Sequence, residues 1–132
     1  MINLNAPINT TTGYGIWKLL REKTEVALFP IGGNINVETK DLEPIIHNDV
    51  GNSFKPSCKH NPNLKIWHQH DLFNRIGSGN YSALTFFELD TLNASEVASL
   101  NHPDKVFVSS SWAKTILENH NIPSGDIKVV PL

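Results

Sequence analysis

The sequence has almost no cysteine and no long hydrophobic run. Cys58 is the only cysteine among 132 residues, so the chain cannot form an internal disulfide, and a reducing compartment is the expected environment. The first ten residues carry no basic stretch ahead of an apolar run, which a signal peptide would need, and no apolar segment reaches the length of a membrane span. The sequence therefore predicts a cytoplasmic protein without a transmembrane segment.

The sequence also lacks an excess of charge of either sign. Its formal net charge is −2 at pH 7, which gives no electrostatic reason to expect nucleic acid or an anionic membrane as a partner. Hydrophobic residues make up 39% of the chain, as in ordinary globular proteins, and 132 residues are enough for one hydrophobic core. We expect a single domain over residues 1–132.

Short apolar runs rich in β-branched and aromatic residues alternate with amphipathic segments. The runs predict six strands, at residues 2–5, 25–30, 64–67, 83–87, 105–109 and 127–130. About four helices are expected between them. This alternation predicts an α/β fold, a Rossmann-like, doubly wound parallel sheet, in which ligands bind at the carboxyl ends of the strands.

Side chains that cap helices mark the expected helix starts. Thr12, Asp41, Asn93 and the serines at 109–111 each precede a helical pattern, and Glu96 would complete a capping box with Asn93. Pro44 is acceptable because it falls in a first turn. The expected apolar faces include Ile16, Leu19 and Leu20 in the first helix, Leu42, Ile45, Ile46 and Val50 in the second, Val97, Ala98 and Leu100 in the third, and Trp112, Ala113, Ile116 and Leu117 in the fourth. We expect Trp17, Trp67 and Trp112 in the core rather than at a sugar-binding surface.

The C-terminal segment, residues 104–132, is the most informative part of the chain. It reads as strand, helix, turn and strand, which is a βαβ unit with a right-handed crossover. Its serine-aromatic-Ala-Lys start at residues 111–114 and its Lys-Val-Val-Pro end at residues 128–131 resemble the end of the N-terminal domain of GT-B glycosyltransferases of the GT4-like group. The rest of the chain resembles that domain more loosely, through a glycine-rich segment, histidines at a strand exit and acids at another.

This resemblance implies the acceptor-side domain of a glycosyltransferase that moves a hexose from a nucleotide sugar to a sugar or lipid-linked acceptor. In such enzymes the chain continues into a C-terminal domain that holds most of the donor nucleotide. Because the sequence stops at Leu132, we expect half of an enzyme that is inactive without a donor domain. The resemblance implies no cofactor and no metal. An exposed cleft face would also allow a homo-oligomer.

Three clusters follow predicted strands and should meet at one edge of the sheet. The first runs from Thr10 through Thr12, Gly13, Tyr14 and Gly15. Its glycines let the backbone approach a ligand, and the helix start behind it offers N–H groups to an anion. It is neither a dinucleotide fingerprint nor a Walker loop. A simple structural turn is the alternative, whereas the resemblance implies a substrate-binding loop.

The second cluster is His68, Gln69, His70 and Asp71, after the strand at 64–67. Histidines and a carboxylate suggest a metal site, but the histidine that a binuclear hydrolase would place two residues after the aspartate is missing. An exposed loop is the plain alternative. The resemblance implies that His68 or His70 lines the acceptor side of the cleft as a catalytic group, with Asp71 binding substrate.

The third cluster is Glu88 and Asp90, two carboxylates on one side of an extended segment. A solvated loop is the alternative to a catalytic Glu88 and a substrate-binding Asp90. Ser110 stands in a serine run that lacks the surroundings of a nucleophile and favours helix capping, although its hydroxyl can still face the cleft.

Two other classes of function remain open. One is a stand-alone flavodoxin-like binding module that uses the same edge for an anionic ligand or a protein partner. The other is a metal-dependent hydrolase, which would carry stoichiometric metal.

Overall fold

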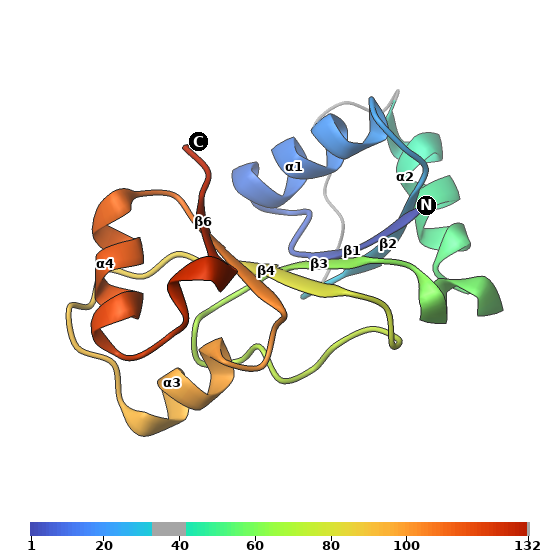
Figure 1. Ribbon diagram of the computed structural model, residues 1–132. Coiled ribbons are helices and arrows are strands. Elements are labelled where there is room, and N and C mark those ends of the chain that lie inside the picture. Colours follow the sequence, from blue (N-terminus) through green and yellow to red (C-terminus); the bar gives the residue numbers. More distant parts are fainter. Residues whose placement is uncertain (33–41, 132) are drawn as a thin grey trace.

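The computed structural model describes residues 1–32 and 42–131 and contains a six-stranded sheet in which every neighbouring pair of strands is parallel (Figure 1). The strand order is β2-β1-β3-β4-β5-β6, so the direction of progress along the sheet reverses between β1 and β3. The strands are β1 (Ile2–Ala6), β2 (Val26–Pro30), β3 (Asn63–Ile66), β4 (Tyr81–Leu84), β5 (Lys105–Val108) and β6 (Ile127–Val129). The α/β prediction with a parallel sheet of six strands is confirmed.

Within the described residues, four α-helices flank the two faces of this sheet (Figure 1). Ala83 and Leu84 are neighbours in β4 and therefore point to opposite faces. Ala83 packs in the apolar cluster that includes side chains of α3 and α4, and Leu84 packs in the cluster that includes side chains of α1 and α2. The helices are α1 (Thr11–Arg21), α2 (Glu43–Asn52), α3 (Ala94–Leu100) and α4 (Ser111–Asn119), with short 3₁₀ helices η2 (Pro56–His60) and η3 (Ser124–Asp126).

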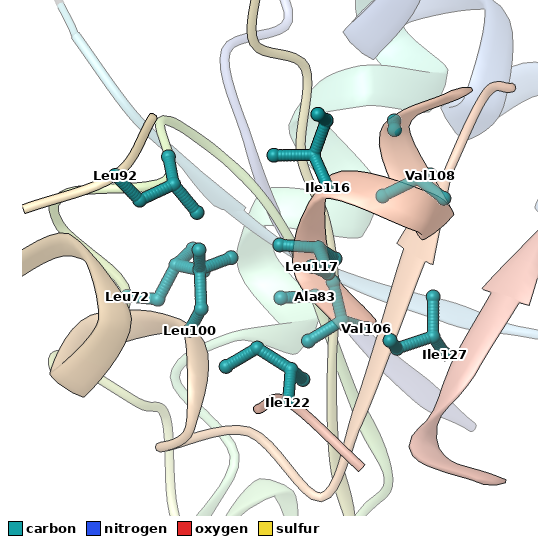
Figure 2. Packing of buried hydrophobic residues seen from close by; sticks show 11 residues of the cluster. Leu72, Ala83, Leu92, Leu100, Val106, Val108, Ile116, Leu117, Ile122 and Ile127 are labelled. Carbon is teal, nitrogen blue, oxygen red and sulfur yellow. The ribbon is translucent and has the colours of Figure 1, made fainter. Parts of the chain in front are cut away.

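Figure 2 shows the core on the α3 and α4 side of the sheet. Leu100 of α3 and Leu117 of α4 meet Val106 of β5, and all three side chains are at most 1% exposed. Full burial of each such side chain stabilises the fold by about 1.5–3 kcal/mol. This half of the core therefore fixes β4, β5 and α4, the elements that carry one part of the candidate site.

Trp17 and Asp49 join α1 to α2 on the other face. The Trp17 side chain is 1% exposed, and its indole N–H donates to Asp49 Oδ2 over 2.8 Å. Arg21 Nε donates to the same oxygen over 2.6 Å. The Asp49 carboxylate thus accepts a hydrogen bond from the buried indole N–H and forms an ion pair with Arg21, whose side chain is 35% exposed.

The expected helix starts are confirmed for α3 and α4. Asn93 and Glu96 form a complete capping box at α3, and Ser110 Oγ accepts the Ala113 N–H at α4. Pro44 lies in the first turn of α2, as predicted. The expectation that Asp41 caps α2 falls outside the described residues.

The cap of α1 was predicted at the wrong threonine. Thr10, not Thr12, accepts the Gly13 N–H, and the helix begins at Thr11. The helix starts earlier because Thr10 is also fixed by the Pro7 carbonyl, which accepts both its N–H and its hydroxyl. The predicted glycine-rich loop is therefore the first turns of a helix.

Three apolar side chains were expected in the core but are not. Leu19 is 55% exposed and Trp112 is 48% exposed, and Ala98 is also exposed. In α1, burial of the larger Trp17 against Asp49 sets the rotation of the helix and turns Leu19 outward. In α3 the buried positions include Ser99 rather than Ala98, and in α4 the expected Ala113, Ile116 and Leu117 are buried while Trp112 is not.

Strand β4 lies further toward the N-terminus than the predicted 83–87 segment. It begins at Tyr81, whose N–H donates to the Asp104 carboxylate over 2.8 Å and whose hydroxyl donates to the Leu72 carbonyl over 2.7 Å. These bonds anchor the strand start, and the strand ends at Leu84. Thr85 and Phe86 therefore leave the strand at the edge of the sheet. Between α2 and β3 the chain forms the 3₁₀ helix η2.

A polar layer lies under β1 and β3. The Asn3 amide donates to the Cys58 carbonyl over 2.7 Å and to Asn63 Oδ1 over 2.9 Å. Lys65, 5% exposed, donates to the Asn74 carbonyl over 2.9 Å, and burial lowers the pKa of its ammonium despite the nearby Asp71 carboxylate. Lys65 pairs with Ala83 of β4, so this layer lies on the same face of the sheet as the α3 and α4 cluster and occupies the part of that face formed by β1 and β3.

Candidate functional site at the carboxyl edge

The carboxyl ends of the strands frame two neighbouring cavities. The first, here called the switch-point cavity, has a volume of about 480 Å³ and lies where β1, β2 and β3 end. The second, called the β4–β5 cavity, has a volume of about 560 Å³ and lies between the ends of those two strands and the start of α4. Phe86 lines both cavities, so its ring is a shared wall. In α/β sheets the reversal of strand order is the usual ligand position.

Apolar and polar side chains line the switch-point cavity from different elements. Ile31 follows β2, Ile66 ends β3, and Phe86 closes the side toward β4. Thr12 from the first turn of α1 and His68 from the exit of β3 also line it. The cavity therefore pairs an apolar wall with a helix start and an imidazole.

The start of α1 directs backbone N–H groups toward this edge. Gly13 N–H is used by the Thr10 cap, and Tyr14 N–H donates to the Thr10 carbonyl. For the N–H groups of Thr11 and Thr12, the described part of the chain supplies no acceptor. These are two of the unpaired donors with which helix starts bind anions.

Gly13 and Gly15 have different roles from those expected of a flexible loop. A Cβ on Gly13 would lie 2.1 Å from the Pro7 carbonyl oxygen, so glycine here permits close packing of α1 against the exit of β1. A Cβ on Gly15 would meet nothing within 4 Å. Neither glycine, nor Tyr14, is among the residues that line the two cavities.

The histidine cluster forms a turn after β3 rather than an extension of the strand. The Asp71 N–H donates to the His68 carbonyl, and the Asp71 carboxylate accepts the Trp67 indole N–H over 3.1 Å. The rings of His68 and His70 stack, with centroids 5.4 Å apart and planes within 10°. Only His68 of the two lines the cavity. Asp71 orients Trp67 in this turn.

Glu96 fixes the same turn from α3. Gln69 donates to Glu96 Oε2 over 2.9 Å, and the other carboxylate oxygen accepts the Asn93 N–H over 3.0 Å. The Asn93 N–H, followed by the Gln69 amide, holds the pKa of Glu96 below its ordinary value. An ionised Glu96 therefore anchors the segment between the two histidines.

The β4–β5 cavity collects hydroxyl groups, a carboxylate and aromatic rings. Thr85, Ser109 and Ser110 line it together with Glu88. Phe87 also lines it and packs against the half-exposed Trp112, with ring centroids 6.1 Å apart. Ser110 Oγ accepts the Ala113 N–H and keeps its own proton to donate.

The predicted site residues divide between the two cavities and their surroundings. Thr12 and His68 line the switch-point cavity, and Glu88 and Ser110 line the β4–β5 cavity. The remaining six predicted residues line neither: Gly13, Tyr14, Gly15, His70, Asp71 and Asp90. Asp90 is exposed and accepts a long hydrogen bond from Thr91. Thr85 precedes the Glu88 cluster in the sequence, but neither Thr85 nor Phe86 was among the predicted site residues, because both were counted as strand residues.

In residues 1–32 and 42–131, no group of three or more histidine, cysteine, aspartate or glutamate side chains is arranged to hold a metal ion. None of the helices in these same ranges is long and apolar enough to cross a membrane.

Comparisons of the chain with protein-family models, with curated proteins and with solved structures found no match. The site must therefore be interpreted from its own geometry and from the sequence resemblance.

Proposed function

We propose that this domain holds the acceptor side of a glycosyltransferase, which moves a hexose from a nucleotide sugar to an acceptor hydroxyl. One observation carries the proposal: His68 and Glu88, from different strand exits, line two cavities that share the Phe86 wall. Group transfer between two substrates needs two adjoining binding spaces with polar groups near their boundary. The resemblance of the C-terminal βαβ segment to GT-B enzymes supports the same conclusion.

In the proposed reaction the switch-point cavity lies next to the departing diphosphate. The N–H groups of Thr11 and Thr12 stabilise negative charge there, because the start of a helix carries a partial positive charge. The His68 imidazole orients the acceptor hydroxyl as an acceptor of its hydrogen bond. A donor-binding domain supplies the contacts to the nucleotide base.

The proposal is tested by a nucleotide-release assay on the protein isolated from its native gene, with a panel of nucleotide sugars. We expect release that depends on an added acceptor, and a turnover about 100-fold lower in His68→Ala, since positioned acid–base groups typically contribute at least that factor. His47→Ala is the matched control, because His47 is an exposed histidine on α2 that lines neither cavity. Absence of release from every nucleotide sugar, or equal turnover in His68→Ala and His47→Ala, would contradict the proposal.

The strand order favours a second candidate, a flavodoxin-like module that binds an anionic ligand or a protein partner without a second domain. The order β2-β1-β3-β4-β5 is the one in which such modules place their ligand between β1 and β3, where the switch-point cavity lies. The two candidates differ in binding by the 132-residue chain. A stand-alone module binds a phosphate-bearing ligand at full strength, whereas an acceptor-side domain binds nucleotide sugar poorly. Isothermal titration with nucleotide sugars and inorganic phosphate distinguishes them.

A further inference from the structure

We propose that the β4–β5 cavity is a saccharide-binding subsite, so that the acceptor of the proposed reaction is a sugar rather than a lipid phosphate. As an assignment of the acceptor, this rests on the proposed glycosyl transfer. The binding of a sugar in the cavity is argued from the cavity alone and is tested without any reaction.

The first observation is the Thr85 hydroxyl, which has no hydrogen-bond partner among the residues that the structure describes. The Thr85 side chain is 1% exposed and lines the cavity, and in the described part of the chain its Oγ1 is the one buried side-chain polar atom left unpaired. A buried hydroxyl without a partner costs about 1–3 kcal/mol. A ligand that forms a hydrogen bond with the Thr85 hydroxyl would offset this cost in free energy. The unpaired hydroxyl therefore points to ligand binding rather than to packing.

The start of α4 is the second observation. Its cap, Ser110, accepts the Ala113 N–H, and for the N–H groups of Ser111 and Trp112 the described residues supply no acceptor. The helix has nine residues, which is enough to give its first turn a partial positive charge. Donors from the helix therefore stand beside the hydroxyls of Ser109 and Ser110 at one side of the cavity.

Glu88 decides which kind of ligand fits these donors. A helix start alone would suit an anion, but the Glu88 carboxylate lines the same cavity and would repel one. A neutral ligand that both donates and accepts hydrogen bonds satisfies both sides. Each sugar hydroxyl does this: it accepts from Thr85, Ser109 or the helix N–H groups, and it donates to Glu88.

The aromatic residues offer a surface for the apolar face of a sugar ring. Phe86 and Phe87 line the cavity, and the exposed Trp112 ring packs against Phe87. A pyranose has an apolar face as well as its hydroxyls, and that face can cover aromatic rings that are otherwise left partly in water. Phe86 is 40% exposed and Trp112 is 48% exposed, so a bound sugar would remove apolar area from water.

The test is a titration of the isotope-labelled 132-residue chain, followed by the NMR shifts of its backbone amides. The probes are a panel of methyl glycosides of the common hexoses and, separately, inorganic phosphate. We expect at least one glycoside to cause saturable shifts at Ser110, Ser111 and Trp112, and phosphate to leave them unchanged. Shifts with phosphate alone would make the cavity an anion site, and no saturable shift with any glycoside would overturn the proposal.

Thr85→Val separates binding from folding. It removes the unpaired hydroxyl at nearly constant shape, so the variant should be as stable as the wild type or more stable, while glycoside affinity falls by about tenfold, the loss of one hydrogen bond. Thr24→Val is the matched control, since Thr24 is exposed and lines neither cavity. If Thr85→Val binds the glycoside as tightly as the wild type, Thr85 does not contact the ligand and this part of the proposal is contradicted.

The outcome is distinguishable from failure of the proposed function. If the protein binds a glycoside but releases no nucleotide, the saccharide subsite is supported and the transferase proposal is contradicted. If nucleotide release depends on a lipid acceptor and no glycoside binds, the transferase proposal is supported and the saccharide subsite is contradicted.

Discussion

Replacing Gly13 or Gly15 by alanine should change stability in opposite directions, although the two residues are only two positions apart in α1. A Cβ on Gly13 would lie 2.1 Å from the Pro7 carbonyl oxygen and 2.8 Å from its carbon. Both atoms belong to the backbone, so the start of α1 would have to move away from the exit of β1. A Cβ on Gly15 would stand in open space.

The magnitudes follow from two opposing terms. Alanine gains about 0.5–1 kcal/mol over glycine inside a helix, and this gain applies at both positions. Overpacking against a fixed backbone costs about 1–3 kcal/mol, and this cost applies only at Gly13. We therefore expect Gly15→Ala to raise the free energy of unfolding by about 0.5–1 kcal/mol and Gly13→Ala to lower it by about 1–2 kcal/mol.

Urea unfolding followed by far-UV circular dichroism measures both changes under identical conditions. The variants serve as controls for each other, since the substitution and the helix are the same. Equal effects of the two substitutions, or stabilisation by Gly13→Ala, would show that α1 does not pack against Pro7 as described. Such a result would also remove the geometry that directs the helix start toward the switch-point cavity.

Three further predictions concern buried polar groups. Asp49→Ala should destabilise the fold by about 3 kcal/mol, because it leaves the Trp17 indole N–H unpaired and buried; urea unfolding measures this, and a loss under about 0.5 kcal/mol would contradict it. Burial raises the pKa of Tyr81 to about 12, so the unfolded chain loses this proton at a lower pH than the folded one. The free energy of unfolding should therefore fall as the pH rises from 10, the ordinary pKa of tyrosine, toward 12. This fall should be smaller in Tyr81→Phe. In the folded chain the pKa of Glu96 lies below its ordinary value, so the ionised carboxylate stabilises the fold. This stabilisation is fully present at a pH above the ordinary pKa and is lost as the pH falls through the lowered pKa. The stability advantage of the wild type over Glu96→Gln should shrink in acid, and an advantage independent of pH would contradict this.

Most of the fold could be predicted because buried parallel strands give short, nearly continuous apolar runs. Those runs located all six strands within a few residues. The capping residues Asn93 and Ser110 located two helix starts because a cap is a local interaction. Helix faces were harder: periodicity identifies an apolar stripe, but the choice between Trp17 and Leu19 depends on Asp49, a residue from another helix.

The candidate site could be predicted in outline only. The carboxyl ends of parallel strands share an edge, so the sequence indicated that Thr12, His68 and Glu88 would lie there. Their division into two cavities depends on the lateral strand order and on where β4 ends. The strand was expected to include Thr85 and Phe86, and only its actual end at Leu84 places them at the edge.

The polar layer under β1 and β3 has a consequence for how this sequence can vary. Asn3 and Lys65 donate to the carbonyls of Cys58 and Asn74, and Asn63 donates to that of Asn61. Every amino acid offers the same carbonyl, so the segments at 56–62 and 72–80 can exchange many side chains and still accept these bonds. Insertion or deletion of a residue would move the carbonyls out of reach. Natural variants of this chain should therefore differ in residue type at the exposed positions of both segments, while the number of residues in each segment stays constant. The buried Cys58 and Leu72 are exceptions, as are Gly77 and Gly79, where a Cβ would clash with backbone atoms.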